Sequence, residues 1–283
     1  MEKIILSFIV FILFVEVHAQ TIQIDNDSAN IRITYSFIQN NPKEEALSRA
    51  DTMALDIGEK LSSFYDLTAS AKNNMISDAM STGEIDFVVL VQNPKDINDL
   101  LLDIEKKKTF NSDNHIPFTI FKNRVNNMVY TQCQNLGVSS ISVFLKEDLA
   151  PQTWSIEGDT CRILDYLCQK AITEFRGRTY EAYFTMDIPI NEGPWKLYGL
   201  PGLILEANTT DGLFRFCAMG IEKIKDKQIN ISYDKKTEVC KDLKQYQDIV
   251  KSQKKVIRIQ EKTNLYYIEI AQSKNIIPLE IGQ

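Results

Sequence analysis

The chain has 283 residues, of which 44% are hydrophobic, 25% charged and 10% aromatic, as in an ordinary globular protein. These proportions exclude a disordered polymer, a collagen and a protein with several membrane spans. The formal net charge of −6 also argues against a nucleic-acid binder, which needs a basic surface to displace counterions from phosphates.

Residues 1–19 have the pattern of a secretory signal peptide. Lys3 supplies the positive start, and an apolar run follows from Ile4 to Val15. This run is shorter than the roughly 20 apolar residues that a membrane-spanning helix needs, and 17–19 fits a cleavage site. We therefore expect export to the periplasm or the medium without a transmembrane anchor, and a single mature domain over 20–283.

Strand patterns, in which apolar and polar residues alternate, dominate the rest of the chain. The predicted strands lie in 22–39, 52–58, 62–66, 87–91, 118–121, 127–133, 141–145, 154–156, 161–174, 179–188, 214–224, 228–233 and 265–270. The tetrapeptide Phe175–Arg178 (FRGR) predicts the turn of a hairpin between two of them.

Three segments have helical patterns. Residues 69–80 form a weak one, and Asp96 begins a second that runs through the charged segment ending at Lys108. The third, 237–251, places an apolar stripe on one face. Many strands joined by short turns predict a mainly β (α+β) fold. Its antiparallel sheet must curve to bury one face, so we expect a curved sheet or half-barrel with two or three covering helices.

The mature chain would keep one histidine, His115, because His18 leaves with the signal peptide. A three-histidine zinc site is therefore excluded, and a Ser-His-Asp or Cys-His catalytic group could use only His115. The phosphate-binding motifs GxGxxG and GxxxxGK[ST] are absent. The sequence thus predicts no cofactor and no metal site.

The chain has five cysteines, an odd number, so at least one thiol stays free or pairs outside the chain. Cys161 and Cys168 cannot pair within one regular strand or helix, because ~10 Å or more would separate them. The disulfide candidates are therefore Cys168 and a cysteine on another strand, such as Cys217. Buried free thiols are the alternative.

The most specific segment is 193–205, GPWKLYGLPGLIL. Its Pro201-Gly202 pair is typical of a type II turn, in which glycine takes a positive φ. The turn has apolar neighbours, so it is either buried as a plug in the core or forms the wall of a ligand groove or docking surface. The residues that would line or close such a groove are Trp195, Tyr198, Leu200, Pro201 and Leu203.

Within this segment, Gly199-Leu200-Pro201-Gly202-Leu203-Ile204 resembles, letter for letter, the signature of the GLPGLI family of exported bacterial proteins. Residues 166–178 and 187–194 also resemble that family, whereas Cys161 and Asp165 depart from its pattern. The resemblance implies an envelope location. It implies no chemistry, because that family has no established activity.

The leading functional hypothesis is a non-enzymatic binding or carrier module for an apolar ligand: a lipid, an acylated protein or a peptide. One alternative is a structural or protein-interaction module of the cell envelope. Another is a hydrolase- or peptidase-like accessory enzyme, for which Cys168 is the candidate nucleophile.

Two groups of charged residues near the motif can be interpreted either as functional or as ordinary surface charges. Asp187 and Glu192 could do acid–base work, although such a pair is expected by chance in an acidic chain. The cations Lys170, Arg176 and Arg178 are either an anion site or a solvated ladder of charges.

Overall fold

The computed structural model describes residues 21–40, 49–67, 118–136, 141–148, 151–252, 254–261 and 264–271. Its elements are β1 (Thr21–Gln39), β2 (Arg49–Ile57), β3 (Leu61–Asp66), β4 (Phe118–Asn123), β5 (Met128–Leu136), β6 (Ile141–Asp148), β7 (Ser155–Ile163), β8 (Tyr166–Phe175), β9 (Arg178–Thr185), β10 (Leu203–Thr209), β11 (Phe214–Asp234), β12 (Glu238–Cys240), α3 (Leu243–Ser252), β13 (Lys254–Glu261) and β14 (Asn264–Ala271). The fold is mainly β, as the sequence predicts. The predictions for 1–19, 69–80, 87–91, 96–108 and His115 lie outside the described residues.

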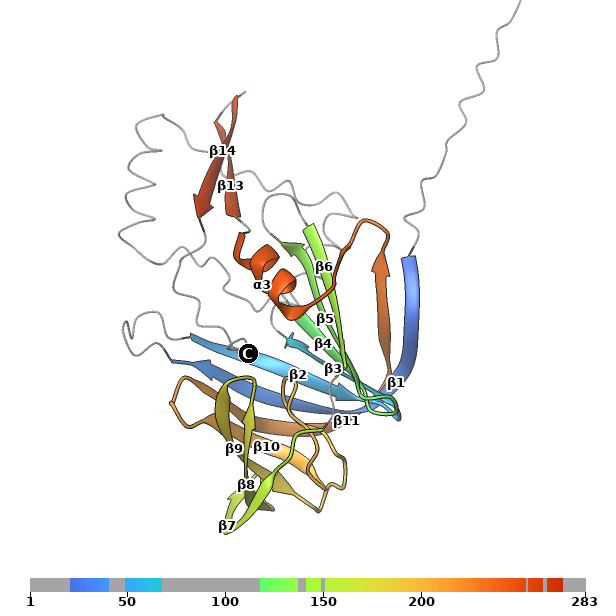
Figure 1. Cartoon of the computed structure of the whole chain (residues 1–283), viewed down its shortest axis with the longest axis vertical. Coiled ribbons are helices and arrows are strands. Elements are labelled where there is room, and N and C mark those ends of the chain that lie inside the picture. The colour runs from blue at the N-terminus through green and yellow to red at the C-terminus, as the bar shows by residue number, and fades with distance from the viewer. Residues whose placement is uncertain are drawn as a thin grey trace, which may run out of the picture.

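One open, curved 12-stranded sheet has the order β12-β6-β5-β4-β3-β2-β1-β11-β10-β9-β8-β7, and β13 and β14 form a separate two-stranded sheet (Figure 1). The large sheet consists of two meanders, β1 to β6 and β7 to β11, in which strands consecutive in the chain are neighbours. The pairing of β1 with β11 joins the two meanders, and only the β12–β6 contact is parallel.

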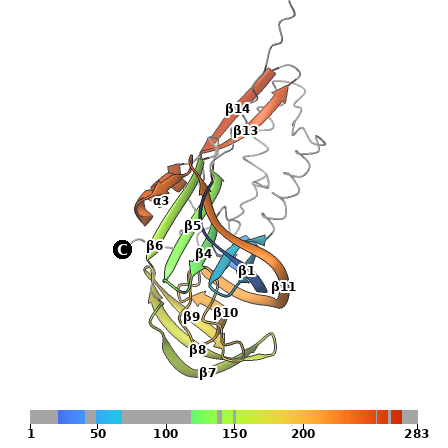
Figure 2. The same ribbon diagram turned by 90° about the vertical axis from the view of Figure 1, so that its right-hand side faces the viewer.

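The joining strands β1 and β11 are long and bent. Their register shifts at three places, among them between Ala29 and Ile31, and such bulges bend a strand and increase its twist. Beyond this bend the ribbon folds back toward β4, β5 and β6 (Figures 1 and 2). The Tyr233 ring packs against Phe144, with ring centroids 4.7 Å apart. A second apolar cluster between the ribbon and this part of the sheet follows from that fold.

The main core lies on the inner face of the sheet, where the alternation in the sequence places it. Ile33, Tyr35 and Phe37 of β1 point into it and are at most 1% exposed. The rings of Phe37 and Phe216 stack with centroids 4.7 Å apart. The apolar segment 193–205 packs into the same cluster, so it fills the curved face from inside the molecule.

The prediction of two or three covering helices is not supported, because α3 is the one α-helix that the described ranges contain. It is also shorter than the predicted 237–251. Asp242 caps it, accepting a hydrogen bond from the Gln245 amide at 2.7 Å, and the chain before this cap pairs with β6 as β12. None of the described helices is long and apolar enough to cross a membrane.

Two strand predictions need correction. Residues 161–174 were expected to form one strand, but Leu164 and Asp165 both take positive φ (49° and 65°) and turn the chain from β7 into β8. The separate strands 214–224 and 228–233 are one strand, β11. The predicted turn at Phe175–Arg178 is confirmed, with positive φ at Arg176 and Gly177.

Candidate functional site

The segment 193–205 lies in the core. Trp195, Leu200 and Leu203 are at most 2% exposed. Hydrogen bonds fix the backbone around them: the Tyr35 hydroxyl donates to the Ile204 carbonyl at 2.6 Å, and Trp154 Nε1 donates to the Tyr198 carbonyl at 2.9 Å. Of the two alternatives that the sequence leaves open, the structure therefore shows the buried plug.

One of the two glycines, Gly202, has a role that differs from the prediction. Gly202 has no positive φ, so a type II turn is not formed there. Instead, a Cβ at Gly202 would overlap the Thr185 carbonyl oxygen and lie 2.7 Å from the Thr185 carbonyl carbon. Gly199 has the positive φ, 109°, and a Cβ there would approach the Gln152 carbonyl oxygen to 3.0 Å. Both glycines therefore serve close packing of backbone on backbone.

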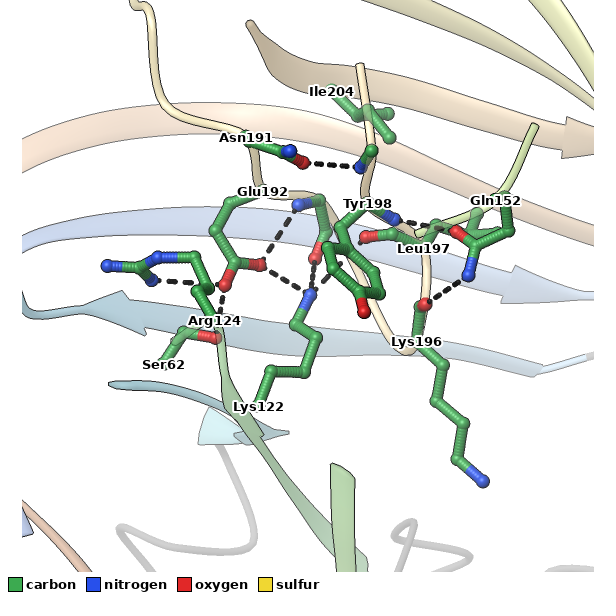
Figure 3. A network of polar contacts seen from close by, with 12 residues as sticks. Ser62, Lys122, Arg124, Gln152, Asn191, Glu192, Lys196, Leu197, Tyr198 and Ile204 are labelled. Atoms are coloured by element: carbon green, nitrogen blue, oxygen red, sulfur yellow. Dashed lines mark hydrogen bonds and ion pairs between the residues drawn. The ribbon is translucent and has the colours of Figure 1, made fainter. Parts of the chain in front are cut away.

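A buried ion cluster lies beside this plug, with Glu192 at its centre (Figure 3). The Glu192 carboxylate is fully buried and lies 2.5 Å from Lys122 Nζ and 3.1 Å from Arg124 Nη1. The Ser62 hydroxyl donates to it at 2.6 Å. A buried carboxylate needs this many partners, because its desolvation is costly. The cluster ties β3 and the β4–β5 hairpin to the segment after β9.

Lys122 connects the cluster to the plug (Figure 3). Its ammonium group donates to the carbonyls of Gly193 at 2.8 Å and Leu197 at 3.3 Å. Burial lowers the pKa of Lys122, and the charge of Glu192 opposes this shift. The Gln152 side chain secures the other side of the loop, since its Oε1 accepts from the Tyr198 amide at 2.9 Å.

A cavity of about 580 Å³ opens where several turns meet beside this cluster, a volume typical of ligand sites. Its lining comes from β1, the β2–β3 and β4–β5 turns, the β6–β7 connection and the segment after β9. The lining residues are Asn30, Ile57, Gly58, Glu59, Arg124, Asn127, Pro151, Pro189, Ile190, Asn191 and Tyr198.

Amides are the main polar groups of the cavity. Asn30 and Asn127 are exposed, and within the described part of the chain neither side chain has a hydrogen-bond partner. Asn191 is engaged, because its Oδ1 accepts a short hydrogen bond from the Gly199 amide. An amide side chain offers a donor and an acceptor in one plane. The cavity can therefore form paired hydrogen bonds with a neutral, hydroxyl-rich ligand.

The one cation in the lining is already occupied. Arg124 Nη1 donates to Glu192, and its Nη2 donates to the carbonyls of Gly58 at 2.6 Å and Glu59 at 2.7 Å. The exposed Glu59 adds a negative charge at the rim. The cavity is therefore poorly suited to an anion.

The predicted groove residues are separated by the fold. Tyr198 lines the cavity, whereas Trp195, Leu200 and Leu203 are core residues and Pro201 is exposed outside the lining. Ligand contact therefore stays a prediction for Tyr198 alone. Asn30, Glu59, Arg124 and Asn127 were missed, because they lie on strands and turns far apart in the sequence and form no motif there.

All five cysteines are free thiols, which is the second of the two alternatives that the sequence leaves open. Cys168 and Cys217 lie on β8 and β11, which two strands separate in the sheet, roughly 14 Å at 4.8 Å per strand. The predicted Cys168–Cys217 pairing does not fit this order. Burial raises the pKa of Cys168 to about 11, which is unlike an activated nucleophile. Within the described residues, no cluster of His, Cys, Asp and Glu is placed to hold a metal ion.

The cations of the β8–β9 hairpin are paired with carboxylates. Lys170 lies 3.2 Å from Glu181, and Arg176 lies 2.7 Å from Glu147. Arg178 forms a short ion pair with Asp211. The hypothesis of an anion site is therefore wrong. The acid–base pair also fails, because Asp187 is exposed while Glu192 is buried among cations.

Glu147, together with its cationic partners Lys196 and Arg176, makes the stability of the fold depend on pH. Burial acts to raise the pKa of Glu147, but the charge of Lys196 at 2.5 Å, together with Arg176, outweighs it and holds the pKa below 4.5. A carboxyl group with a lowered folded pKa stabilises the fold above its unfolded pKa, and this contribution is lost as pH falls through the folded value. We expect urea unfolding to show a larger loss of stability from pH 7 to pH 3 for the native chain than for Glu147→Gln. Equal losses would contradict this.

Comparison with known proteins now identifies the family. Residues 86–248, more than half of the chain, match the model of the N-glycanase peptide, N-terminal domain (PNGase F-II). The chain belongs to this family. The match begins after β3, but β1, β2 and β3 lie in the middle of the sheet order, so the folded unit extends beyond the matched range.

Two solved structures of PNGF-II, in space groups C2 and P21, are similar to the chain. Each has a TM-score of 0.47 and 19% identity, over 83% of this chain and 35% of its own. The chain thus spans about a third of the length of those structures. A comparison with curated proteins finds no match.

The family match corrects two sequence-based interpretations. The resemblance to the GLPGLI family is wrong, since the matching model is that of the N-glycanase domain. The hypothesis of a lipid carrier falls with it, and the burial of Leu200 and Leu203 removes the apolar surface on which it depended.

Proposed function

We propose that this chain is a non-catalytic recognition domain whose cavity binds the neutral core saccharide of N-linked glycans. The observation that carries the proposal is the lining of the cavity. The unengaged amides of Asn30 and Asn127 can pair with vicinal hydroxyl or acetamido groups. The family adds support, because it is named for an N-glycanase.

The apolar part of the lining fits the same ligand. Ile57, Pro151, Pro189 and Ile190 surround the polar groups, and such side chains can pack on the C–H faces and acetamido methyl groups of a sugar. Binding sites commonly combine apolar walls with a few placed polar groups. The engaged Arg124 and the acidic Glu59 disfavour sialylated or phosphorylated ends. The proposal therefore selects the N-acetylglucosamine core of the glycan.

The signal-like residues 1–19 fit this proposal, because glycoproteins with N-linked glycans are encountered outside the cell. We expect the exported chain to begin at Gln20. Mass spectrometry of the chain recovered from the expressing cell's exported fraction measures this, and an intact Met1–Ala19 segment would contradict it.

The direct test is calorimetric titration of the chain with N,N′-diacetylchitobiose. We expect saturable binding and an affinity about three- to tenfold lower for Asn30→Ala, the loss of one hydrogen bond. Asn127→Gly should weaken binding similarly, since glycine keeps the positive φ of 54° at that position.

The matched control is Asn230→Ala, an exposed strand asparagine of β11 outside the cavity, which should bind like the native chain. Sialyllactose should bind more weakly than the chitobiose probe. No chitobiose binding, or equal effects of Asn30→Ala and Asn230→Ala, would reject the proposed function.

A further inference from the structure

A second feature of the fold, independent of the cavity, involves two cysteines at the outer end of the sheet. The β7–β8 hairpin places Cys161 directly opposite Cys168 in the strand register. Directly opposed residues in an antiparallel pair have Cα atoms about 4.5 or 5.5 Å apart. Disulfides join Cα atoms about 4.4–6.8 Å apart. The backbone therefore already provides the separation that a bond between these sulfurs requires.

The turn that creates this juxtaposition is tight and well fixed. Leu164 and Asp165 both have positive φ, the conformation of a two-residue hairpin turn. Arg162 Nη1 donates to the Asp165 carbonyl at 2.9 Å and braces it. Cys161 lies close enough to influence Cys168, because the pKa of Cys168 is raised first by burial and then by the charge of Cys161.

The two thiols differ in solvent exposure, and this difference determines which of them reacts first. Cys161 is partly exposed, whereas Cys168 is fully buried. An oxidant from solution therefore meets Cys161 first, and Cys168 is in place to resolve the adduct. The sheet order excludes the other cysteines as partners: β9 and β10 separate Cys217 from Cys168, and Cys133 and Cys240 lie on β5 and β12, beyond β1.

We infer that Cys161 and Cys168 form a reversible cross-strand disulfide when the chain meets a low-molecular-weight disulfide. The Cys161 thiolate attacks the disulfide RSSR, giving a mixed disulfide and releasing RS⁻. The Cys168 thiolate then attacks the Cys161 sulfur and releases the second RS⁻. The two cysteine thiols lose two electrons and two protons in total, and RSSR is reduced to two thiols.

The bond would strengthen one edge of the sheet. β7 is an edge strand, and β8 is its one partner among the described strands. The β7–β8 register shifts between Ile156 and Thr160, so residues 157–159 lack regular pairing. A link at Cys161 would hold the strand beyond that irregularity. Reduction would release it.

The test uses the full chain, incubated folded with oxidised glutathione at pH 8.5, alkylated and digested with trypsin. The two cysteines fall in separate tryptic peptides, 147–162 and 163–170, because Arg162 lies between them. We expect these two peptides joined by a disulfide. Peptide 216–223, which contains Cys217, should carry an alkylated thiol.

Two variants complete the design. Cys161→Ser should abolish the joined peptide, and Cys217→Ser, the matched control, should retain it. Amide hydrogen exchange in β7 should be severalfold slower in the oxidised chain than in the reduced one. Glutathione left on Cys161 alone, a Cys168–Cys217 link, or a link that forms only in urea would each overturn the inference.

Discussion

Replacement of Glu192 by glutamine is expected to lower the free energy of unfolding by about 3–5 kcal/mol, the cost of removing one partner of a buried ion pair. The variant leaves the Lys122 ammonium fully buried without its carboxylate at 2.5 Å. Arg124 and the Ser62 hydroxyl keep at most one neutral carbonyl oxygen to share in place of the carboxylate. Urea unfolding at pH 7 measures the effect.

The pH dependence of this variant identifies its cause. Burial already lowers the pKa of Lys122, and without Glu192 the pKa should fall further. A lysine with a lowered folded pKa binds fewer protons when folded, so stability rises with pH toward the unfolded value of about 10.5. Glu192→Gln should therefore gain more stability than the native chain between pH 7 and pH 10.

The matched control is Glu181→Gln, which removes a partly exposed carboxylate from Lys170. Its cost should be at most about 1 kcal/mol. The double variant Lys122→Met/Glu192→Gln should recover part of the loss, because no unpaired charge remains. Equal destabilisation by Glu181→Gln and Glu192→Gln would refute the central role of the cluster.

The second large effect is expected from Gly202→Ala, at about 3 kcal/mol or more. The added Cβ would overlap the Thr185 carbonyl oxygen and lie 3.1 Å from Met186 Cα. These are backbone atoms at the end of β9, so no side chain can rotate away, and overpacking of a rigid core costs about 1–3 kcal/mol or occasionally more.

Gly220→Ala is the control for this substitution. A Cβ at Gly220 meets no atom within 4 Å, and the change should alter stability by less than about 1 kcal/mol. Thermal unfolding of both variants tests the difference. A Gly202→Ala chain as stable as Gly220→Ala would show that the backbone does not approach β9 as described.

The parts of the fold that could be predicted depend on neighbours in the sequence. The alternation in β1 places Ile33, Tyr35 and Phe37 on one face because the side-chain period of a strand is two. The turn at Arg176-Gly177 has glycine to signal it. The turn at Leu164-Asp165 has neither glycine nor asparagine, so the alternating pattern predicts one uninterrupted strand over 161–174.

The site could not be predicted, because tertiary packing creates it. Asn30 and Asn127 meet only when the β1 bend and the β4–β5 turn come together. Glu192 could be noticed as an acidic residue near the motif, but its three side-chain partners lie 68 or more positions away. The apolar motif suggested a ligand groove because the sequence does not distinguish an apolar segment that fills the core from one that lines a groove.

An amide ¹H–¹⁵N NMR titration of the chain with N,N′-diacetylchitobiose shows directly whether the cavity binds a saccharide. Binding there should give saturable shifts concentrated at Asn30, Gly58, Glu59, Asn127 and Asn191, with the β7–β8 hairpin unchanged. Unchanged spectra at millimolar sugar, or shifts confined to residues outside the cavity, would contradict it.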